Sequence, residues 1–192
     1  MALIMVGGQT KNVGKTTLIC NIVAAFPRVR WTAVKITNHL HAPQHCEMVE
    51  TGDGWTIWKQ NSTKDHSDTA RFLTSGANRG LLVQSRESSL SEACASLQSE
   101  LASASTVIVE SASAAEFLDP TLLLVLLDPA QSDFKQSARQ QFERADAFIV
   151  RSANFEVIEQ IDCTKKPVFA ASPHHLDPAL LSMLEAKVGS NA

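Results

Sequence analysis

Short apolar segments alternate with longer segments of helical periodicity along the chain. Residues 2–6 are all apolar, which predicts a buried strand, and Leu18, Ile22 and Phe26 then recur every four positions, which predicts a helix. Similar apolar runs predict further strands at 30–37, 80–85, 106–111, 121–128, 147–152 and 167–172. Helices are predicted between and after them at 67–77, 88–103, 132–146, 155–161 and 177–188.

This alternation predicts a three-layer α/β fold, in which a mainly parallel sheet of about seven strands carries helices on both faces. A chain of 192 residues, 44% of them hydrophobic, can form one sizeable core, so we expect a single domain over 1–192. Ligands of such folds bind at the carboxyl ends of the strands. The candidate walls of a site are therefore the loops at 7–15, 38–66, 110–119, 128–132, 151–154 and 171–176.

The stretch GGQTKNVGKTTL at 7–18 joins the first predicted strand to the first predicted helix. This is the context of a phosphate-binding loop, in which backbone N–H groups and the helix N-terminus face the phosphates. In such a loop Lys15 reaches the β- and γ-phosphates and Thr16 binds Mg²⁺. We expect a nucleotide to bind Lys11, Asn12, Val13, Gly14, Lys15, Thr16 and Thr17.

The spacing of this loop is unusual, because five residues rather than four separate Gly8 from Gly14. The alternative interpretation is a turn at Gly14 followed by a solvated lysine at the start of a helix. A lysine in the first helical turn opposes the helix dipole, and a bound phosphate would neutralise that unfavourable charge. The pattern therefore favours the phosphate-binding loop.

Lys35 and Asp68 are two further candidates for the phosphate side of the site. Lys35 lies in an otherwise apolar strand, two residues before its end, where a lysine either reaches water at a sheet edge or faces an anion. Its place near the carboxyl end favours the anion. Asp68 lies in the first turn of its predicted helix, where it either suits the dipole alone or helps to bind a metal. We expect Lys15, Lys35 and Asp68 to be catalytic.

Glu110 and Asp128 each end an apolar strand, and they are the two candidates for the carboxylate that binds the metal ion. A carboxylate in that position needs a cationic partner, which Mg²⁺ with its waters would supply. Pro129 directly follows Asp128, and an Asp-Pro pair commonly begins a turn. We therefore expect Glu110, with Thr16 and Asp68, to bind Mg²⁺.

Charge and composition exclude several classes of partner. A formal net charge of −3 provides no general attraction to nucleic acid or to an anionic membrane surface. The longest apolar run, at 122–127, is too short to span a bilayer, and the four cysteines are scattered without a C-x-x-C pair. We expect a cytoplasmic protein without nucleic-acid or membrane partners, and the sequence leaves open whether it forms a homodimer.

The run GGQTKNVGKTT resembles the phosphate loop of dethiobiotin synthetase, which also has five residues between its glycines. In that family a lysine on the second strand, a serine-aspartate pair starting a helix and a glutamate ending a later strand complete the site. Lys35, Ser67, Asp68 and Glu110 occupy those places here. This resemblance implies ATP as the nucleotide.

Residues 1–112 are also similar to the adaptor family of molybdopterin-guanine dinucleotide biosynthesis. The similarity is carried by VKITNHLH at 34–41, STKDHSDTARFLTSGANRGLLV at 62–83 and VIVES at 107–111. It implies GTP as the nucleotide and slow hydrolysis that serves a partner enzyme. Together the two resemblances place the chain in the signal-recognition, partitioning and biotin-type superfamily of P-loop NTPases.

The segment 38–66 is the expected switch or docking surface, and it carries unusual side chains. His39, His41, His45 and Cys46 lie within eight residues, a spacing that could bind Zn²⁺ or Ni²⁺ but is also found in loops that bind nothing. Trp55 and Trp58 follow, either as packing residues or as a contact for a base or a partner.

Few residues are candidates for recognition of the nucleotide base. The NKxD guanine signature is absent, and Asn154 lies just after the strand at 147–152, where its amide could contact a purine edge. His174 and His175 follow the last predicted strand and could join a nucleotide or substrate wall. ATP and GTP both stay open.

Three functions fit these residues. The first is transfer of a phosphoryl group to a small molecule, or its ligation, with the segment 38–66 closing over the acceptor. The second is a nucleotide-dependent adaptor in which hydrolysis changes the shape of that segment for a partner enzyme. The third, delivery of a metal through the histidine segment, has the least support. We favour the adaptor, because no acceptor-specific motif is visible.

Overall fold

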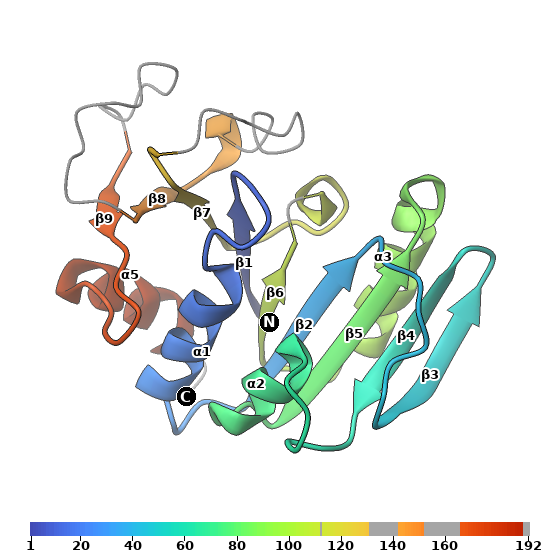
Figure 1. The fold of residues 1–192 in the computed structure, drawn as a ribbon. Coiled ribbons are helices and arrows are strands. Elements are labelled where there is room, and N and C mark those ends of the chain that lie inside the picture. The colour runs from blue at the N-terminus through green and yellow to red at the C-terminus, as the bar shows by residue number, and fades with distance from the viewer. Residues whose placement is uncertain (112, 131–141, 152–165, 190–192) are drawn as a thin grey trace.

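The computed structural model describes residues 1–111, 113–130, 142–151 and 166–189. Within them, nine strands form one sheet in the order β3-β4-β5-β2-β6-β1-β7-β8-β9 (Figure 1). The strands are β1 Ala2–Gly8, β2 Trp31–Thr37, β3 Cys46–Gly52, β4 Trp55–Gln60, β5 Arg79–Ser85, β6 Thr106–Glu110, β7 Leu122–Leu127, β8 Ala147–Val150 and β9 Val168–Ala170. The helices are α1 Lys15–Ala25, α2 Asp68–Thr74, α3 Leu90–Glu100 and α5 Pro178–Val188, with 3₁₀ turns η1 Glu87–Ser89 and η2 Ala114–Glu116.

The seven strands from β5 to β9 along this order are all parallel, as the sequence predicts. β1 and β7 lie in the middle of the sheet and are buried at every position, which explains why both are apolar without alternation. Their carboxyl ends lie at one edge of the sheet together with those of β2, β5 and β6. The predicted α/β class is confirmed.

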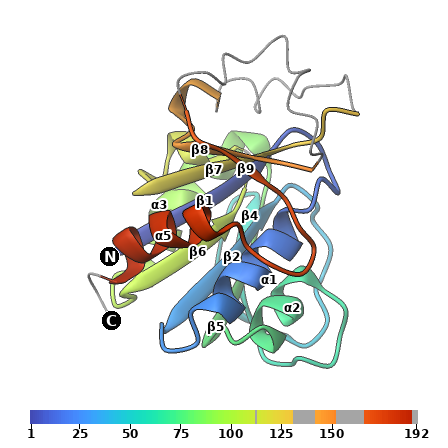
Figure 2. The same cartoon turned by 90° about the vertical axis from the view of Figure 1, so that its left-hand side faces the viewer.

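Helices cover both faces of the sheet (Figure 2). On one face α1, α2 and α5 pack onto a core that includes Ile22, Phe72 and Leu184. On the other face α3 packs onto a core that includes Cys94 and Leu97. The helices have 7 to 11 residues, and in the described part of the chain none has both the length and the apolar character needed to cross a bilayer.

The expectation that 38–66 is a loop is wrong for much of its length. β3 and β4 form an antiparallel hairpin there, and β4 pairs with β5, so the sheet has two more strands than the seven predicted. Trp55 and Ile57 on β4 are buried against α3, whereas β3 is almost fully exposed. β3 was not predicted because its sequence is polar, and an edge strand with few buried side chains lacks the apolar pattern by which strands are recognised.

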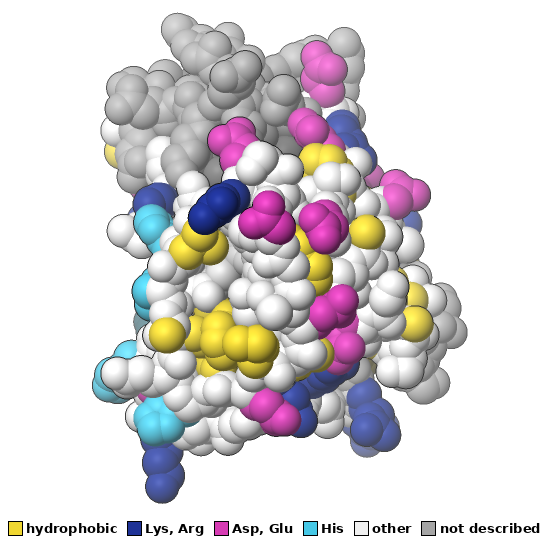
Figure 3. Space-filling model, turned by 90° about the vertical axis from the view of Figure 1, so that its right-hand side faces the viewer, with side chains coloured by type: hydrophobic (Ala, Val, Ile, Leu, Met, Phe, Trp, Pro, Cys, Tyr) yellow, Lys and Arg dark blue, Asp and Glu magenta, His cyan; other side chains and the backbone are white. Residues whose placement is uncertain are grey.

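The outer edge of β3 bears features that discourage pairing with another sheet. The register with β4 shifts between Met48 and Glu50, and Glu47 and Glu50 place negative charge on the strand. The side chains of Met48 and Val49 are exposed beside them. Figure 3 faces this side of the molecule and shows a small group of hydrophobic side chains with acidic side chains next to it.

Two predicted helices are not fully described. The helix predicted at 132–146 is seen at its end, where residues 142–144 are helical, and the helix predicted at 155–161 lies outside the described residues. The apolar stripe predicted for the first helix includes Phe26, but α1 ends one position earlier, at Ala25. Phe26 then caps it and packs edge-on against Trp31, with ring centroids 6.4 Å apart.

Candidate functional site

The loop between β1 and α1 presents a helix N-terminus without a side-chain cap. Gly14 is the N-cap of α1 with φ of 110°, a left-handed conformation that favours glycine, and this cap residue offers no side-chain acceptor to the first-turn N–H groups. No acidic residue lies in that first turn, which begins with Lys15. These N–H groups and the helix dipole form a ready site for an anion.

Packing under the loop explains the glycine at its start. A Cβ at Gly8 would lie 2.7 Å from Val13 Cγ1, and Val13 is fully buried. A side chain at position 8 would therefore push the loop away from β1. Gly8 is required for the close approach of loop and strand.

Gln9, the first of the five residues between the glycines, anchors the loop to β7. It is 1% exposed, its backbone N–H donates to Leu126 O at 2.9 Å, and its Oε1 accepts from Asp128 N at 2.9 Å. A buried glutamine must have partners for its polar atoms, and these contacts hold the longer loop in place. The sequence showed that the loop was one residue longer than usual but did not predict this role for Gln9.

The two residues expected at the phosphates and the metal lie at the start of α1. Lys15 Nζ donates to Thr10 O at 2.9 Å, so its side chain folds back across the loop. Thr16 Oγ1 donates to Glu110 Oε2 at 2.7 Å. The structure thus brings Thr16 and Glu110 together from positions 94 residues apart.

Asp128, the rival of Glu110, lies in a different setting. One of its oxygens accepts from Ala130 N at 3.1 Å, which is the turn that the Asp-Pro pair favours, and the other lies 3.6 Å from Arg151 Nη1. Asp128 does not line the cavity that Glu110 lines. Its contacts therefore differ from those expected of the metal-side acid.

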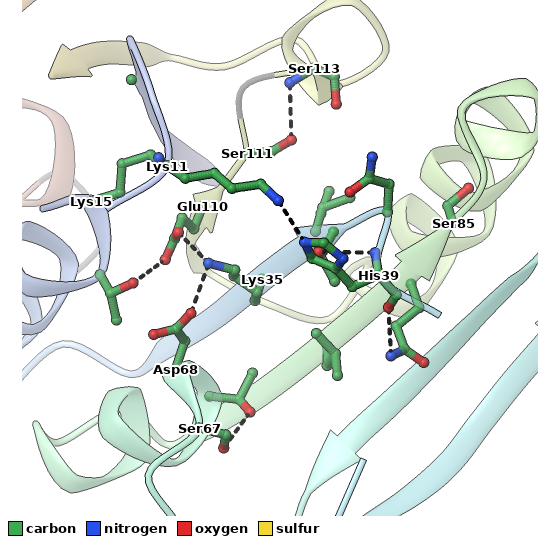
Figure 4. A pocket seen from close by; sticks show the side chains of 18 of the residues that line it. Lys11, Lys15, Lys35, His39, Ser67, Asp68, Ser85, Glu110, Ser111 and Ser113 are labelled. Atoms are coloured by element: carbon green, nitrogen blue, oxygen red, sulfur yellow. Dashed lines mark hydrogen bonds and ion pairs between the residues drawn. The ribbon is translucent and has the colours of Figure 1, made fainter. Parts of the chain in front are cut away.

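Lys35 lies between two carboxylates. Its register partner on β6 is Glu110, with which its ammonium forms an ion pair, and its Nζ lies 2.8 Å from Asp68 Oδ2 (Figure 4). Burial disfavours the charged form, but the Glu110 charge and the hydrogen bonds to both carboxylates outweigh it and raise the pKa of Lys35 above its usual value. The anions that Lys35 faces here belong to the protein itself.

Helix α2 brings Asp68 to this cluster. Ser67 caps the helix by accepting from Ala70 N at 3.2 Å, so Asp68 is its first residue. Arg71, which the sequence analysis did not identify, lies one turn later. Its guanidinium is 3.7 Å from Asp68 Oδ1 and donates to Thr17 Oγ1 at 3.3 Å, linking α2 to α1.

Two cavities flank the loop between β1 and α1. The larger, about 840 Å³, is lined by the loop, the Lys35 cluster, the start of α2, the ends of β2 and β5, and Ser111 and Ser113. The smaller, about 330 Å³, is lined by residues 170–173 and 175–177 and by Arg151. Both cavities are lined by Asn12, Gly14 and Thr17, so a ligand on the loop can reach into each of them.

The remaining candidates for base recognition lie near the smaller cavity. His175 lines it and contacts Ser172 Oγ through Nδ1 at 2.8 Å, whereas His174 does not line it. Asn154 lies outside the described residues. The carboxyl ends of β8 and β9 provide this wall, as the parallel sheet requires.

The structure does not gather the histidine segment into a metal site. Cys46 Sγ donates to Gln60 Oε1 at 3.2 Å, while His39 Nε2 contacts Lys11 Nζ at 2.9 Å. Among the described residues, no group of three or more His, Cys, Asp or Glu side chains could hold a metal ion. Trp55 is a core residue, and Trp58 on the other face of the hairpin donates from Nε1 to Gln84 Oε1 at 2.9 Å.

Comparison with known proteins supports the fold. No protein-family model matches the chain, and no curated protein sequence matches it. The structure is similar to HypB from Helicobacter pylori, solved in complex with nickel, with a TM-score of 0.57 and 19% identity over 100% of this chain and 89% of HypB. It is also similar to LpxK from Aquifex aeolicus, solved with ATP, with a TM-score of 0.52 and 18% identity over 88% of this chain and 53% of LpxK. The chain therefore shares the α/β fold of these two proteins.

Proposed function

We propose that the chain binds a purine nucleoside triphosphate with Mg²⁺ and slowly cleaves the bond between its β- and γ-phosphates. One observation carries the proposal: the N-terminus of α1, capped by Gly14 without a side-chain acceptor, opens onto a cavity lined by Lys15, Thr16 and Glu110, in which Thr16 donates to Glu110. Backbone N–H groups, an ammonium and a hydroxyl-carboxylate pair are the groups that bind Mg²⁺-triphosphate in proteins.

The two cavities suggest how the nucleotide lies. With its phosphates on the loop, the base and ribose would enter the smaller cavity beside Arg151 and His175, and the γ-phosphate would face the larger one beside Lys35. We expect Asn154 to contribute to the base side, because it follows β8 shortly after Arg151. Either ATP or GTP fits this arrangement.

The side chains near Thr16 fit a magnesium ion by their chemistry. Mg²⁺ prefers hard oxygen ligands and is commonly held by one or two carboxylates together with phosphate oxygens and water. Thr16, Asp68 and Glu110 would hold it, and when bound it would neutralise charge on the phosphates. Lys35 now lies between the two carboxylates, so we expect its ammonium to turn toward the γ-phosphate when the ion binds.

The chemistry assigned to the protein's own residues is electrostatic. Lys15 and Lys35 would stabilise the negative charge of the transferring phosphoryl group, and Asp68 would position Lys35. A water or an acceptor hydroxyl attacks the γ-phosphorus, the bond to the bridging oxygen breaks, and the nucleoside diphosphate leaves. The attacking oxygen loses its proton to solvent or to phosphate.

A lysine-to-alanine pair tests nucleotide binding. Lys15→Ala should abolish binding of both ATP and GTP, as measured by isothermal titration with Mg²⁺ present, while the urea midpoint changes little. Lys187→Ala, at an exposed position near the end of α5, is the matched control and should bind like the unaltered protein. Equal affinity of the two variants for nucleotide would refute the proposal.

Two uses of the nucleotide are supported by different observations. A role as an adaptor in molybdopterin-guanine dinucleotide-like cofactor biosynthesis rests on the resemblance of residues 1–112, and exposed Leu40, Met48 and Val49 offer a surface for a partner enzyme. Phosphoryl transfer to a small molecule is favoured by the size of the larger cavity, which exceeds what a γ-phosphate needs. Turnover that rises with a partner protein supports the first, and turnover that rises with a small acceptor supports the second.

Delivery of a metal has weaker support. HypB was solved in complex with nickel, but the described residues of this chain hold no group of three His, Cys, Asp or Glu side chains that could bind a metal ion. Cys46 faces Gln60 rather than His39.

A further inference from the structure

Residues 38–45, here called the strap, cross from the end of β2 to the start of β3 without regular secondary structure. All strap side chains except that of Pro43 are exposed, so burial contributes little to holding it in place. Its position must therefore depend on a few polar contacts.

Gln84 on β5 provides two of those contacts. The side chain is 4% exposed, and its Nε2 donates to the backbone carbonyls of His39 at 2.9 Å and His41 at 2.6 Å. Its Oε1 accepts from Trp58 Nε1, and an indole can only donate. Trp58 therefore fixes which way the amide points, so that both N–H groups of Gln84 face the strap.

His39 connects the strap to the phosphate loop. Its Nε2 lies 2.9 Å from Lys11 Nζ, and since an ammonium has no acceptor, the imidazole must accept from it. In Figure 4 the Lys11 side chain extends from the loop across the larger cavity to His39. A continuous series of contacts thus runs from Trp58 through Gln84 and His39 to Lys11.

We infer that Gln84 is a positioning residue for triphosphate binding, because it fixes the strap and so holds the Lys11 ammonium over the γ-phosphate end of the loop. The inference rests on the proposed nucleotide site. Lys11 extends into the larger cavity, where the γ-phosphate would lie, and it does not line the smaller one. Loss of its fixed position should therefore weaken binding of a triphosphate more than binding of a diphosphate.

The test is Gln84→Met, which keeps the side-chain length and removes both donors and the acceptor. Amide hydrogen exchange across 38–45 should become faster in the absence of nucleotide. The dissociation constant for a non-hydrolysable triphosphate analogue should rise roughly tenfold, the change expected for loss of one charge-assisted contact, and that for the diphosphate less than about twofold. Gln44→Met makes the same chemical change at an exposed strap position and should alter neither measurement.

His39→Ala supplies a second variant at an exposed position, where folding is not at risk. It should lower triphosphate affinity to the same degree as Gln84→Met, and the double variant should lose no more, because both act through Lys11. Unchanged amide exchange across 38–45 in Gln84→Met would overturn the inference. So would faster exchange if the ratio of the dissociation constants for triphosphate and diphosphate stayed unchanged. If the unaltered protein binds neither the triphosphate nor the diphosphate, both the proposed function and this inference are refuted. If the unaltered protein binds nucleotide and the variants bind it equally well, only the role of Gln84 is refuted.

Discussion

Replacing Lys35 by methionine should destabilise the fold through the charge left on Glu110. The Glu110 side chain is 4% exposed, and among the described side chains the Thr16 hydroxyl would remain as its donor. An uncompensated buried charge costs about 3–5 kcal/mol. Because the side chains of Lys35 and Asp68 are 21% and 35% exposed, water reaches part of the cluster, and we expect a loss of about 2–3 kcal/mol in the free energy of unfolding.

A double-mutant cycle separates this cost from general damage. Glu110→Gln leaves Lys35 paired with Asp68 and should cost about 1 kcal/mol. In the double variant neither member of the Lys35–Glu110 pair is charged. Its loss should therefore be smaller than the sum of the single losses by about 1–2 kcal/mol.

The measurement is urea unfolding followed by tryptophan fluorescence, to which the fully buried Trp31 contributes. The folded pKa of Lys35 is raised above its usual 10.5, so its contribution is complete below that pH and is lost only as the pH rises through the folded value. The cost of Lys35→Met should therefore be constant from about pH 6 to pH 9. This account of the cluster would be refuted if the losses of unfolding free energy in Lys35→Met and Glu110→Gln were additive, or if Lys35→Met cost less than about 0.5 kcal/mol.

Three further outcomes are expected. Gly8→Ala should cost about 1–3 kcal/mol and abolish nucleotide binding, because the new Cβ would lie 2.7 Å from Val13 Cγ1; unchanged titration curves would contradict this. Gln9→Ala should cost about 1–3 kcal/mol in urea unfolding by leaving the Asp128 N–H without its acceptor, and a neutral effect would show that water replaces it. Burial raises the pKa of Cys94 to about 11, so iodoacetamide should label it only on unfolding, as mass spectrometry of the labelled peptides can check.

The sequence identifies the candidate phosphate loop clearly because the information is local. The glycines, Lys15 and Thr16 lie within a few positions of one another, between a run of apolar residues and a helical stripe, and no distant contact is needed to recognise them. Lys35 and Glu110 could be named as candidates for a related reason. A charged residue at the end of an apolar strand is conspicuous wherever the strand lies in the sheet.

The hairpin at 46–60 could not be predicted in the same way. β3 is nearly all exposed, and the alternation of Trp55 and Ile57 in β4 is too short to distinguish from a loop. What makes the segment a pair of strands is the pairing of β4 with β5, a contact that the sequence does not display. The same pairing places Trp58 beside Gln84.

The sequence by itself determined the order of the seven parallel strands and of helices α1, α2, α3 and α5, and it identified the candidate phosphate loop and the candidate groups at the ends of the strands, since each depends on neighbours within about one helical turn or one strand. The tertiary structure alone decided which of those groups meet. Lys35 faces Glu110 because β2 and β6 are adjacent in the sheet, and Gln84 reaches the strap because β5 lies under it. Such contacts depend on strand order and register, which are set by packing over the whole molecule rather than by any one segment.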